Sequence, residues 1–303
     1  MKYSLATIRR DGRAVAAIET GGRWFDLAQV APELLEPNPA RGLINLFENW
    51  ADREPRLQAL AKALVARASE AIPEPSADDF MTPLQYPAKL ILTGTNYYDH
   101  VKKDAGILSF DKANAVPIFF LKPPTTALAG PGPIAYPAQS VKYDWEIELA
   151  VVLGKGGRNI PEAEALDYVA GYTIGLDMSA RDWQFHPKHA FKFDLFGGKA
   201  FDQSCPIGPR IIPASQIDAD SLQMKLFVNG ELKQDANTSD MIWNVAEQIS
   251  LISEHVTLEA GDIVLTGTPS GVGMATNSYL KIGDRVEAHI DSLGELCIDV
   301  VAS

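Results

Sequence analysis

The chain has 303 residues, of which 46% are hydrophobic and 22% are charged, a balance typical of a soluble protein with one large domain, or one large and one small. Its net charge of −12 argues against nucleic acid as a partner, because phosphate binding relies on basic patches. There is no apolar run of about 18 residues and no signal-peptide core, so we expect a cytoplasmic protein that does not bind membranes. Cys205 and Cys297 lack metal-binding spacing and are expected to be free thiols.

The first 75 residues are predicted to form a small N-terminal α+β domain. Residues 1–31 are predicted to form a small antiparallel sheet, because their Asp-Gly and Gly-Gly dipeptides favour hairpins. Residues 43–50 and 56–68 have apolar residues at helical spacing, and a proline-containing connector follows. We expect residues 76–303 to form the catalytic domain.

The catalytic domain opens with an apolar strand at residues 89–93 that runs into a polar, aromatic turn containing His100. A strand fixes what the following turn presents, so such turns often carry function. His100 could equally be a structural histidine at the start of a helix. Residues 117–122 are predicted to form a second strand, and 131–137 a loop leading into the next element.

An alternating strand at residues 143–153 carries the strongest chemical pattern. Trp145 and Ile147 point to one face, and Glu146 and Glu148 point to the other. Residues two apart in a strand are separated by roughly 6.5–7 Å, so the two carboxylates can converge on one divalent cation. The alternative is an ordinary amphipathic strand with both acids in water.

The next predicted strand, residues 169–178, follows a short helix that begins near Pro161. It is almost wholly apolar until Asp177, and an acid at the end of a buried strand requires a partner. Residues 178–199 mix aromatics, cations and glycines without periodicity, which indicates a loop over a site. His186 and His189 in this loop are not predicted to bind metal, because Pro187 interrupts their spacing.

The C-terminal part is predicted to contain a hairpin around Asn229-Gly230, a helix over 241–255 capped by Thr238 or Ser239, and strands near 263, 284–290 and 295–301. Most of the domain is therefore β. The glycine-rich stretch 266–273 matches neither dinucleotide nor P-loop fingerprints, nor a serine-hydrolase elbow.

Several motifs together resemble the fumarylacetoacetate hydrolase superfamily over about residues 88–302. They are Gly94-Thr-Asn-Tyr-Tyr-Asp-His100, Phe120-Leu-Lys-Pro123, Trp145-Glu-Ile-Glu-Leu149, Gly171 through Asp182, Gly198-Lys-Ala-Phe-Asp202, Val228-Asn-Gly230 and Leu265 through Gly273. The resemblance implies an α+β, mostly β chain with a mixed β-roll fold, and a homodimer.

The resemblance also implies a Mg²⁺ or Mn²⁺ ion, which Ca²⁺ could replace in crystals, and a 2-oxo or 2,4-dioxo acid as substrate. The metal would be held by Glu146, Glu148 and Asp177. An all-oxygen ligand set suits such a hard cation. Six further residues take roles by motif position: His100 and Lys199 in catalysis, and Arg181, Gln184, Thr268 and Tyr97 in substrate binding. Lys122 is a further candidate for substrate binding.

One position departs from the family pattern. Relatives that hydrolyse acylpyruvates carry a glutamate three residues after the histidine, where this chain has Lys103. A charged lysine cannot accept a proton from imidazole. Asp104 could take the role after a register adjustment, Asp111 or Asp194 could fold in, or hydrolysis by that route does not occur.

Three functions follow as hypotheses. The first is a Mg²⁺- or Mn²⁺-dependent hydrolase that cleaves a C–C bond in a 2,4-diketo acid to give pyruvate or a related acid. The second is decarboxylation or keto–enol isomerisation of an oxaloacetate-like acid, which the lysine at position 103 favours. The third is a keto-acid binding protein without turnover.

Overall fold

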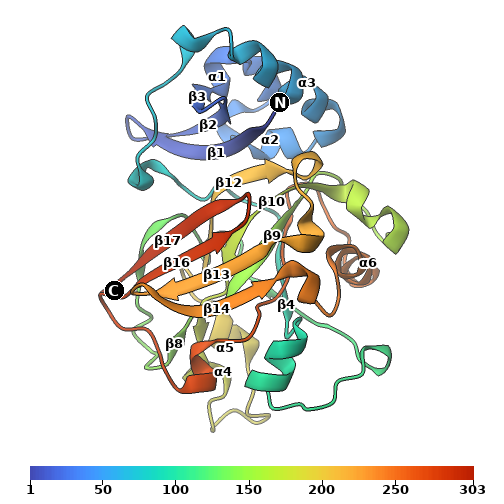
Figure 1. The fold of residues 1–303 in the computed structure, drawn as a ribbon, viewed down its shortest axis with the longest axis vertical. Coiled ribbons are helices and arrows are strands. Elements are labelled where there is room, and N and C mark those ends of the chain that lie inside the picture. Colours follow the sequence, from blue (N-terminus) through green and yellow to red (C-terminus); the bar gives the residue numbers. More distant parts are fainter.

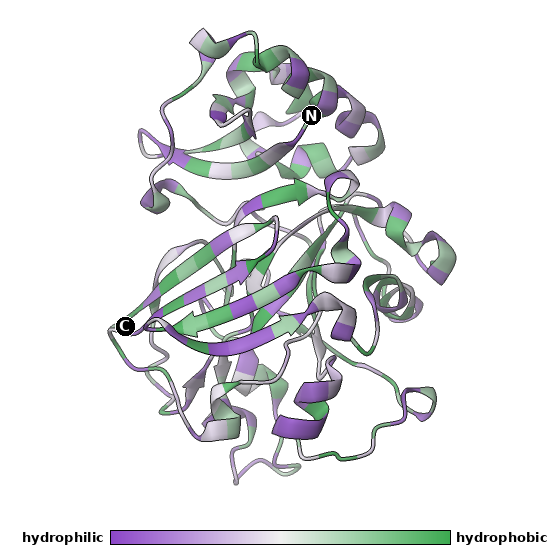
Figure 2. Cartoon of the chain, viewed as in Figure 1, coloured by the Kyte–Doolittle hydropathy of each residue, from purple (hydrophilic) through white to green (hydrophobic).

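The computed structural model describes residues 1–303 and confirms a mostly β, mixed-sheet architecture. The N-terminal region lies at one end of the molecule, and a larger body built around two curved sheets lies below it (Figure 1). Hydrophobic and hydrophilic residues alternate along the strands of this body, whereas the helical turn near residue 100 is mostly hydrophilic (Figure 2). No helix is both long enough and apolar enough to cross a bilayer.

The larger sheet has ten strands. Nine follow the order β3-β2-β1-β12-β10-β9-β15-β4-β5, and β6 pairs separately with β12. Its members are β1 (Tyr3–Arg10), β2 (Arg13–Thr20), β3 (Arg23–Asp26), β4 (Leu90–Gly94), β5 (Ile118–Lys122), β6 (Leu128–Ala129), β9 (Ile147–Leu153), β10 (Val169–Leu176), β12 (Cys205–Pro213) and β15 (Ile263–Leu265). Because β1 pairs with β12 at Leu5 and Ile211, the N-terminal strands continue the sheet of the body.

A second sheet of five strands has the order β14-β13-β16-β17-β7. It comprises β7 (Gly132–Ala135), β13 (Gln223–Val228), β14 (Glu231–Asn237), β16 (Arg285–Ile290) and β17 (Gly294–Val301). Two short strands, β8 (Tyr143–Asp144) and β11 (Ser179–Ala180), pair with each other beside the site described below. The segment 131–137, predicted as a loop, contains β7, because residues 132–135 pair in parallel with β17.

Both faces of β9 are buried, and the predicted alternation holds. Ile147, Leu149 and Val151 belong to the core between the two sheets. Ala150 and Val152 belong to a second core that includes Leu5 and Phe47 of the N-terminal region. A large buried area on each side supplies the hydrophobic free energy that can hold polar groups inside the protein.

The helices are short apart from two. They are α1 (Leu27–Val30), α2 (Ile44–Phe47), α3 (Trp50–Leu64), α4 (Arg181–Gln184), α5 (Leu195–Lys199), α6 (Val245–His255) and α7 (Gly273–Thr276). The segment after Pro161 is a 3₁₀ helix at Glu162–Tyr168. The prediction that Thr238 or Ser239 caps the helix at 241–255 is wrong: Asn244 caps α6, since its side chain accepts from Glu247 N at 2.9 Å.

Helix α3 begins at Trp50, six residues before the predicted start at Arg56. Packing explains the earlier start, because Trp50 stacks on Phe47 with ring centroids 5.3 Å apart. Trp50 also covers Gly154, which directly follows β9. A Cβ at Gly154 would lie 2.7 Å from Trp50 Cβ.

We therefore expect Gly154→Ala to lower the free energy of unfolding by about 1–3 kcal/mol, because overpacking forces the helix away from the sheet. Urea denaturation measures the effect. Gly94→Ala is the matched control, since a Cβ there would meet Ile118 at an ordinary 3.5 Å. Equal stabilities of the two variants would show that the contact between α3 and the sheet is not tight.

Candidate metal centre and active site

The register of two antiparallel strands brings three acids together. On β9 and β10, Glu148 lies opposite Gly175 and Ile147 lies opposite Leu176. One step further, Asp177 N donates to Glu146 O at 2.9 Å. Because side chains alternate with a period of two, all three acids share one face. Their carboxylate oxygens lie within 4.8 Å of one another, and all three residues are buried.

Two lysines neutralise part of this acidic cluster. Lys199 Nζ, at the end of α5, lies 2.7 Å from Glu146 Oε2 and 2.6 Å from Asp177 Oδ2. Lys122 Nζ, at the end of β5, lies 2.5 Å from Asp177 Oδ1 and donates to the backbone oxygens of Met178 and Ser204 at 3.1 and 2.6 Å. Lys122 therefore lies behind the acids, among backbone carbonyls.

Arg181 is shared between two acids. Its Nε donates to Asp144 Oδ2 at 2.7 Å, its Nη1 donates to Gln184 Oε1 at 2.9 Å, and its Nη2 contacts Glu146. Asp144 also accepts from the backbone N–H groups of Gly273 and Met274 at 2.6 and 3.0 Å. These bonds tie the strand of the acids to α4 and to the start of α7.

The two glutamates are in opposite electrostatic states. Burial raises the pKa of Glu146, but Lys199 and Arg181 outweigh it and lower the pKa to about 2. Burial and the carboxylates of Asp177 and Glu146 raise the pKa of Glu148, which no cation contacts. Its one hydrogen bond comes from Gly267 N at 2.6 Å.

The donor set fits a hard divalent cation. It consists of carboxylate oxygens only, as Mg²⁺ and Mn²⁺ prefer. Asp177 Oδ1 has no partner other than the ammonium group of Lys122, and the buried Glu148 lacks a positive partner. A cation at this point would give Glu148 the positive partner that the chain does not supply.

A histidine and a carboxylate form a second feature of the site. Residues His100–Asp104 form a single π-helical turn, and His100 Nδ1 lies 2.7 Å from Asp104 Oδ2. The wider turn supplies the register adjustment that the sequence left open, because the acid four residues after the histidine meets the ring. Lys103 points away, with its side chain 66% exposed. Asp111 and Asp194 instead cap short helices.

Asp104 is held as a carboxylate by the glycine-rich loop. Ser270 Oγ donates to Asp104 Oδ1 at 2.8 Å and Gly271 N donates to Oδ2 at 3.1 Å. Burial raises the pKa of Asp104, but the hydrogen bonds from His100 and Ser270 lower it by more. A carboxylate only accepts, so Nδ1 of His100 carries the proton and Nε2 holds the free lone pair.

Both features open into one cavity of about 190 Å³. The sequence-predicted residues that line it are His100, Asp104, Glu146, Asp177, Arg181, Gln184, Lys199 and Thr268. Glu148 lies beneath this lining, beside Glu146 and Asp177. Tyr97 does not reach the cavity: it is fully buried in the core, with its hydroxyl 3.4 Å from Met224 Sδ. Lys122 contacts Asp177 from behind and is likewise not part of the lining.

The aromatic loop contributes one wall of the cavity. Phe185, Phe193 and Leu195 line it, and the rings of Phe185 and Phe193 lie 5.6 Å apart. Phe191 and Phe196 are 93% and 73% exposed and point elsewhere. The segment is thus a loop over a site, as predicted, although it includes the short helices α4 and α5.

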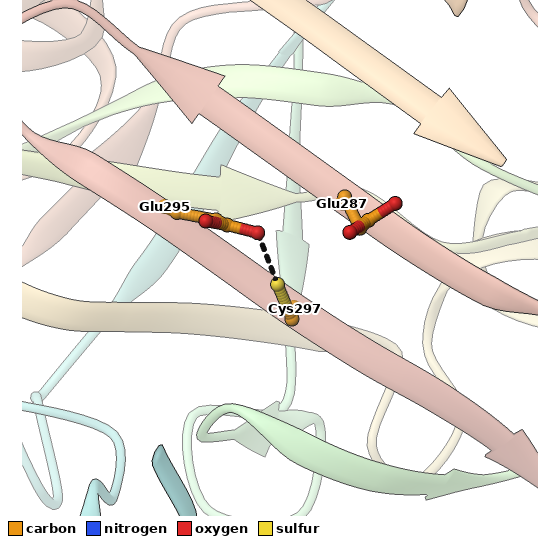
Figure 3. Close-up of side chains that lie close together, drawn as sticks. All are labelled: Glu287, Glu295 and Cys297. Atoms are coloured by element: carbon orange, nitrogen blue, oxygen red, sulfur yellow. Dashed lines mark hydrogen bonds between the residues drawn. The ribbon is translucent and has the colours of Figure 1, made fainter. Parts of the chain in front are cut away.

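A second acidic group lies on the second sheet, far less buried. Glu287, Glu295 and Cys297 come from β16 and β17, and Cys297 Sγ lies 2.7 Å from Glu295 Oε1 (Figure 3). Burial and this hydrogen bond raise the pKa of Cys297 to about 12, so the thiol stays protonated and is a poor metal ligand. The buried cluster is the better metal site.

Comparison with known proteins identifies the family. The model of the fumarylacetoacetate (FAA) hydrolase C-terminal family matches residues 89–301. The chain belongs to the fumarylacetoacetate hydrolase family. Hydrolases, isomerases and tautomerases all occur among its relatives, so membership establishes an enzyme superfamily rather than one reaction.

Three relatives bear on the site. An oxaloacetate tautomerase of Xenopus laevis is 37% identical over 94% of this chain and 84% of its own length. Maleylpyruvate hydrolase from Sphingobium sp. SYK-6, solved with manganese(II) and pyruvate, is 31% identical over 99% of both chains, with a TM-score of 0.75. Fumarylpyruvate hydrolase from Pseudomonas aeruginosa, solved with Mn²⁺ and pyruvate, is 37% identical over 75% of this chain and 93% of its own, with a TM-score of 0.64.

Sequence reasoning missed three residues that shape the site. Asp144 stands two positions before Glu146. An acid in that largely apolar stretch could have been identified from the sequence as a candidate site residue. Ser270 holds Asp104, and Gln234 donates to Thr268 Oγ1 at 2.9 Å. No local pattern marks either of them, because each acts across a long sequence separation.

The contrast between the two glutamates gives a stability prediction for protein without divalent metal at pH 7. Glu148→Gln should raise the free energy of unfolding by about 1–3 kcal/mol, because it removes a buried acid whose charge is opposed. Glu146→Gln should lower it by about 3–5 kcal/mol, because Lys199 and Arg181 each lose one of their two buried carboxylate partners. Urea denaturation in chelator measures both values.

The pH dependence has a definite sign. A folded-state pKa raised above the unfolded value stabilises the fold at low pH, and this stabilisation is lost as the pH rises toward the folded pKa. The stability gain of Glu148→Gln over wild type should therefore grow from pH 4.5 to pH 7, a window of about 2.5 units that starts near the unfolded pKa. A gain that shrinks over this range would contradict the assignment.

Proposed function

We propose that this protein is a divalent-metal-dependent enzyme of 2-oxo acids that catalyses keto–enol tautomerisation of an oxaloacetate-like substrate. The observation that carries the proposal is the joint opening of the acid cluster and the His100–Asp104 pair into one cavity. The oxaloacetate tautomerases that align with most of the chain support the choice of reaction.

The charges of the site favour an anionic substrate. The buried cluster contains four carboxylates, Asp144, Glu146, Glu148 and Asp177, against three cations, Lys122, Arg181 and Lys199. With all groups ionised the sum is −1, and a divalent ion would change it to +1. The carboxylate next to the 2-oxo group would then bring it to zero, whereas a cationic substrate would add buried charge that nothing balances.

Glu146, Glu148 and Asp177 would hold the ion, which when bound would supply Lewis-acid polarisation of the substrate's oxygens. Arg181 and Lys199 line the same side of the cavity and would orient the substrate carboxylate and balance negative charge that develops on the 2-oxo oxygen. His100 lines the same cavity, and in this pose C3 of the substrate would face it.

His100 would move the proton. Its Nε2 takes a proton from C3, so the C3–H bond breaks and its electron pair forms the C2–C3 double bond. The same nitrogen returns the proton to the C2 oxygen to give the enol, and no atom is gained or lost. Asp104 fixes the ring and stabilises the imidazolium between the two transfers.

Hydrolysis of a C–C bond in a 2,4-diketo acid is the second candidate. The observation that favours it is the pairing of His100 with a carboxylate, since such a histidine can activate water at a distal carbonyl. The two reactions share the enolate and differ in what His100 deprotonates, a carbon or a water molecule.

A substrate panel distinguishes the candidates. Enol absorbance with oxaloacetate, pyruvate release from acylpyruvates and CO₂ release from oxaloacetate should be followed with Mg²⁺ or Mn²⁺ and after exhaustive chelation. We expect accelerated enol–keto exchange of oxaloacetate that chelation abolishes and metal restores. Pyruvate release alone would favour the hydrolase, and metal-dependent binding without any product would favour the binding protein.

The role of the histidine–carboxylate pair is tested separately. His100→Ala and Asp104→Asn should each lower kcat for tautomerisation by about 10²–10⁴-fold, because proton transfer loses its base or the base loses its orientation. Lys103→Ala, at an exposed position in the same turn, should stay within twofold of wild type. Full activity of His100→Ala would contradict the proton-transfer mechanism but would not contradict the proposed metal site.

A further inference from the structure

Thr95 has an unusual backbone conformation at the edge of the cavity. Its φ is +59°, and it is the only β-branched residue of the chain with a positive φ. A β-branched side chain crowds the backbone in this left-handed region, so such residues are strained outliers that occur where the surroundings enforce them. Thr95 also lines the cavity that holds His100 and the acids.

The next residue enforces the conformation. Asn96 is fully buried, and its side chain donates to Trp243 O at 2.9 Å and to Thr266 O at 2.7 Å. Its Oδ1 accepts from Trp243 N at 2.8 Å, and its backbone oxygen accepts from Ile242 N at 2.8 Å. Asn96 is therefore fixed at four points, and the chain just before it has no freedom to relax.

Thr95 is also a polar group of the cavity without a partner in the chain. Thr93 Oγ1 donates to Gln248 at 2.6 Å and Thr268 Oγ1 accepts from Gln234 at 2.9 Å. The charged side chains of the lining pair with one another. Neither the hydroxyl nor the backbone N–H of Thr95 makes a hydrogen bond within the protein, so both can donate to a ligand.

The position of Thr95 indicates which part of a ligand it meets. It lies five residues before His100 on the segment that follows β4. If the substrate carboxylate and 2-oxo oxygen face the acid cluster and C3 faces His100, the group beyond C3 continues along the wall that carries Thr95. Gln184 and Thr268 also line the cavity, but they stand beside the acid cluster, since Gln184 accepts from Arg181 and Gly267 N donates to Glu148.

We infer that Thr95 is a specificity-determining residue that selects a 2-oxo acid with a distal carboxylate, by donating from its hydroxyl and its backbone N–H. This inference rests on the proposed function and specifies the class of substrate. The strain at Thr95 is then the cost of presenting two donors in a fixed direction. A rigid donor pair loses little entropy on binding the carboxylate.

Binding of stable analogues tests the inference independently of turnover. Malate and lactate are 2-hydroxy acids that differ only in the distal carboxylate, and calorimetry on the Mg²⁺-loaded full chain gives their affinity ratio. We expect wild type to prefer malate. Thr95→Val keeps the shape and removes the hydroxyl, so the ratio should fall about tenfold or more while lactate affinity stays within twofold.

Two further variants separate the hydroxyl from the backbone. Thr95→Ser should keep the wild-type ratio, because it keeps both donors. Thr95→Gly should lose preference for malate and melt at a higher temperature than Thr95→Val, because glycine adopts positive φ without strain.

The outcomes are distinguishable from failure of the proposed function. If wild type binds neither acid and converts no 2-oxo acid, the proposed function is wrong and this inference falls with it. If wild type binds 2-oxo acids but Thr95→Val leaves the malate-to-lactate ratio unchanged, or weakens both acids equally, the inference alone is overturned.

Discussion

The structure depends on a charge imbalance buried between two sheets. Four carboxylates and three cations are removed from water where β9 begins and β10 ends, and burial of this kind is costly unless each charge has a partner. Six of the seven groups find one. Glu148 has no positively charged partner, and the pKa of its carboxyl is raised as a result of burial beside two other carboxylates. A divalent ion would give Glu148 its missing partner and change the sum of charges from −1 to +1, which the carboxylate of a bound 2-oxo acid would then balance.

The surrounding architecture serves to hold this cluster in place. The antiparallel register of β9 and β10 sets the spacing of the three acids, and buried apolar faces on both sides of β9 hold the register. The glycine-rich loop then closes over the acids with backbone N–H groups, at Gly267 for Glu148 and at Gly271 for Asp104. Both glycines have positive φ, and a Cβ at Gly271 would lie 2.1 Å from Lys233 O, so no other residue fits there. One loop thus connects the metal site with the proton-transfer pair.

Much of this site could be predicted from the sequence because its signals are local. The alternation around Glu146 and Glu148 gave the shared face, and the apolar run ending in Asp177 gave an acid in need of a partner. The partner of His100 could not be chosen, since a single π-helical turn decides whether position 103 or 104 meets the ring. Tyr97 was misplaced for a related reason: motif position does not say which side of a turn a side chain occupies. Similarly, the strand at 132–135 exists only through its pairing with β17, and the start of α6 depends on a cap at Asn244 rather than at the earlier hydroxyl residues.

The central claim is that Glu146, Glu148 and Asp177 bind one divalent ion. Anomalous diffraction from crystals soaked in Mn²⁺ tests it most directly, because the scattering locates the ion without reference to activity. The account predicts one strong peak per chain within bonding distance of all three carboxylates, with Lys199 Nζ moved off at least one of them. A peak at Glu287, Glu295 and Cys297 instead, or no peak among the buried acids at saturating Mn²⁺, would contradict it.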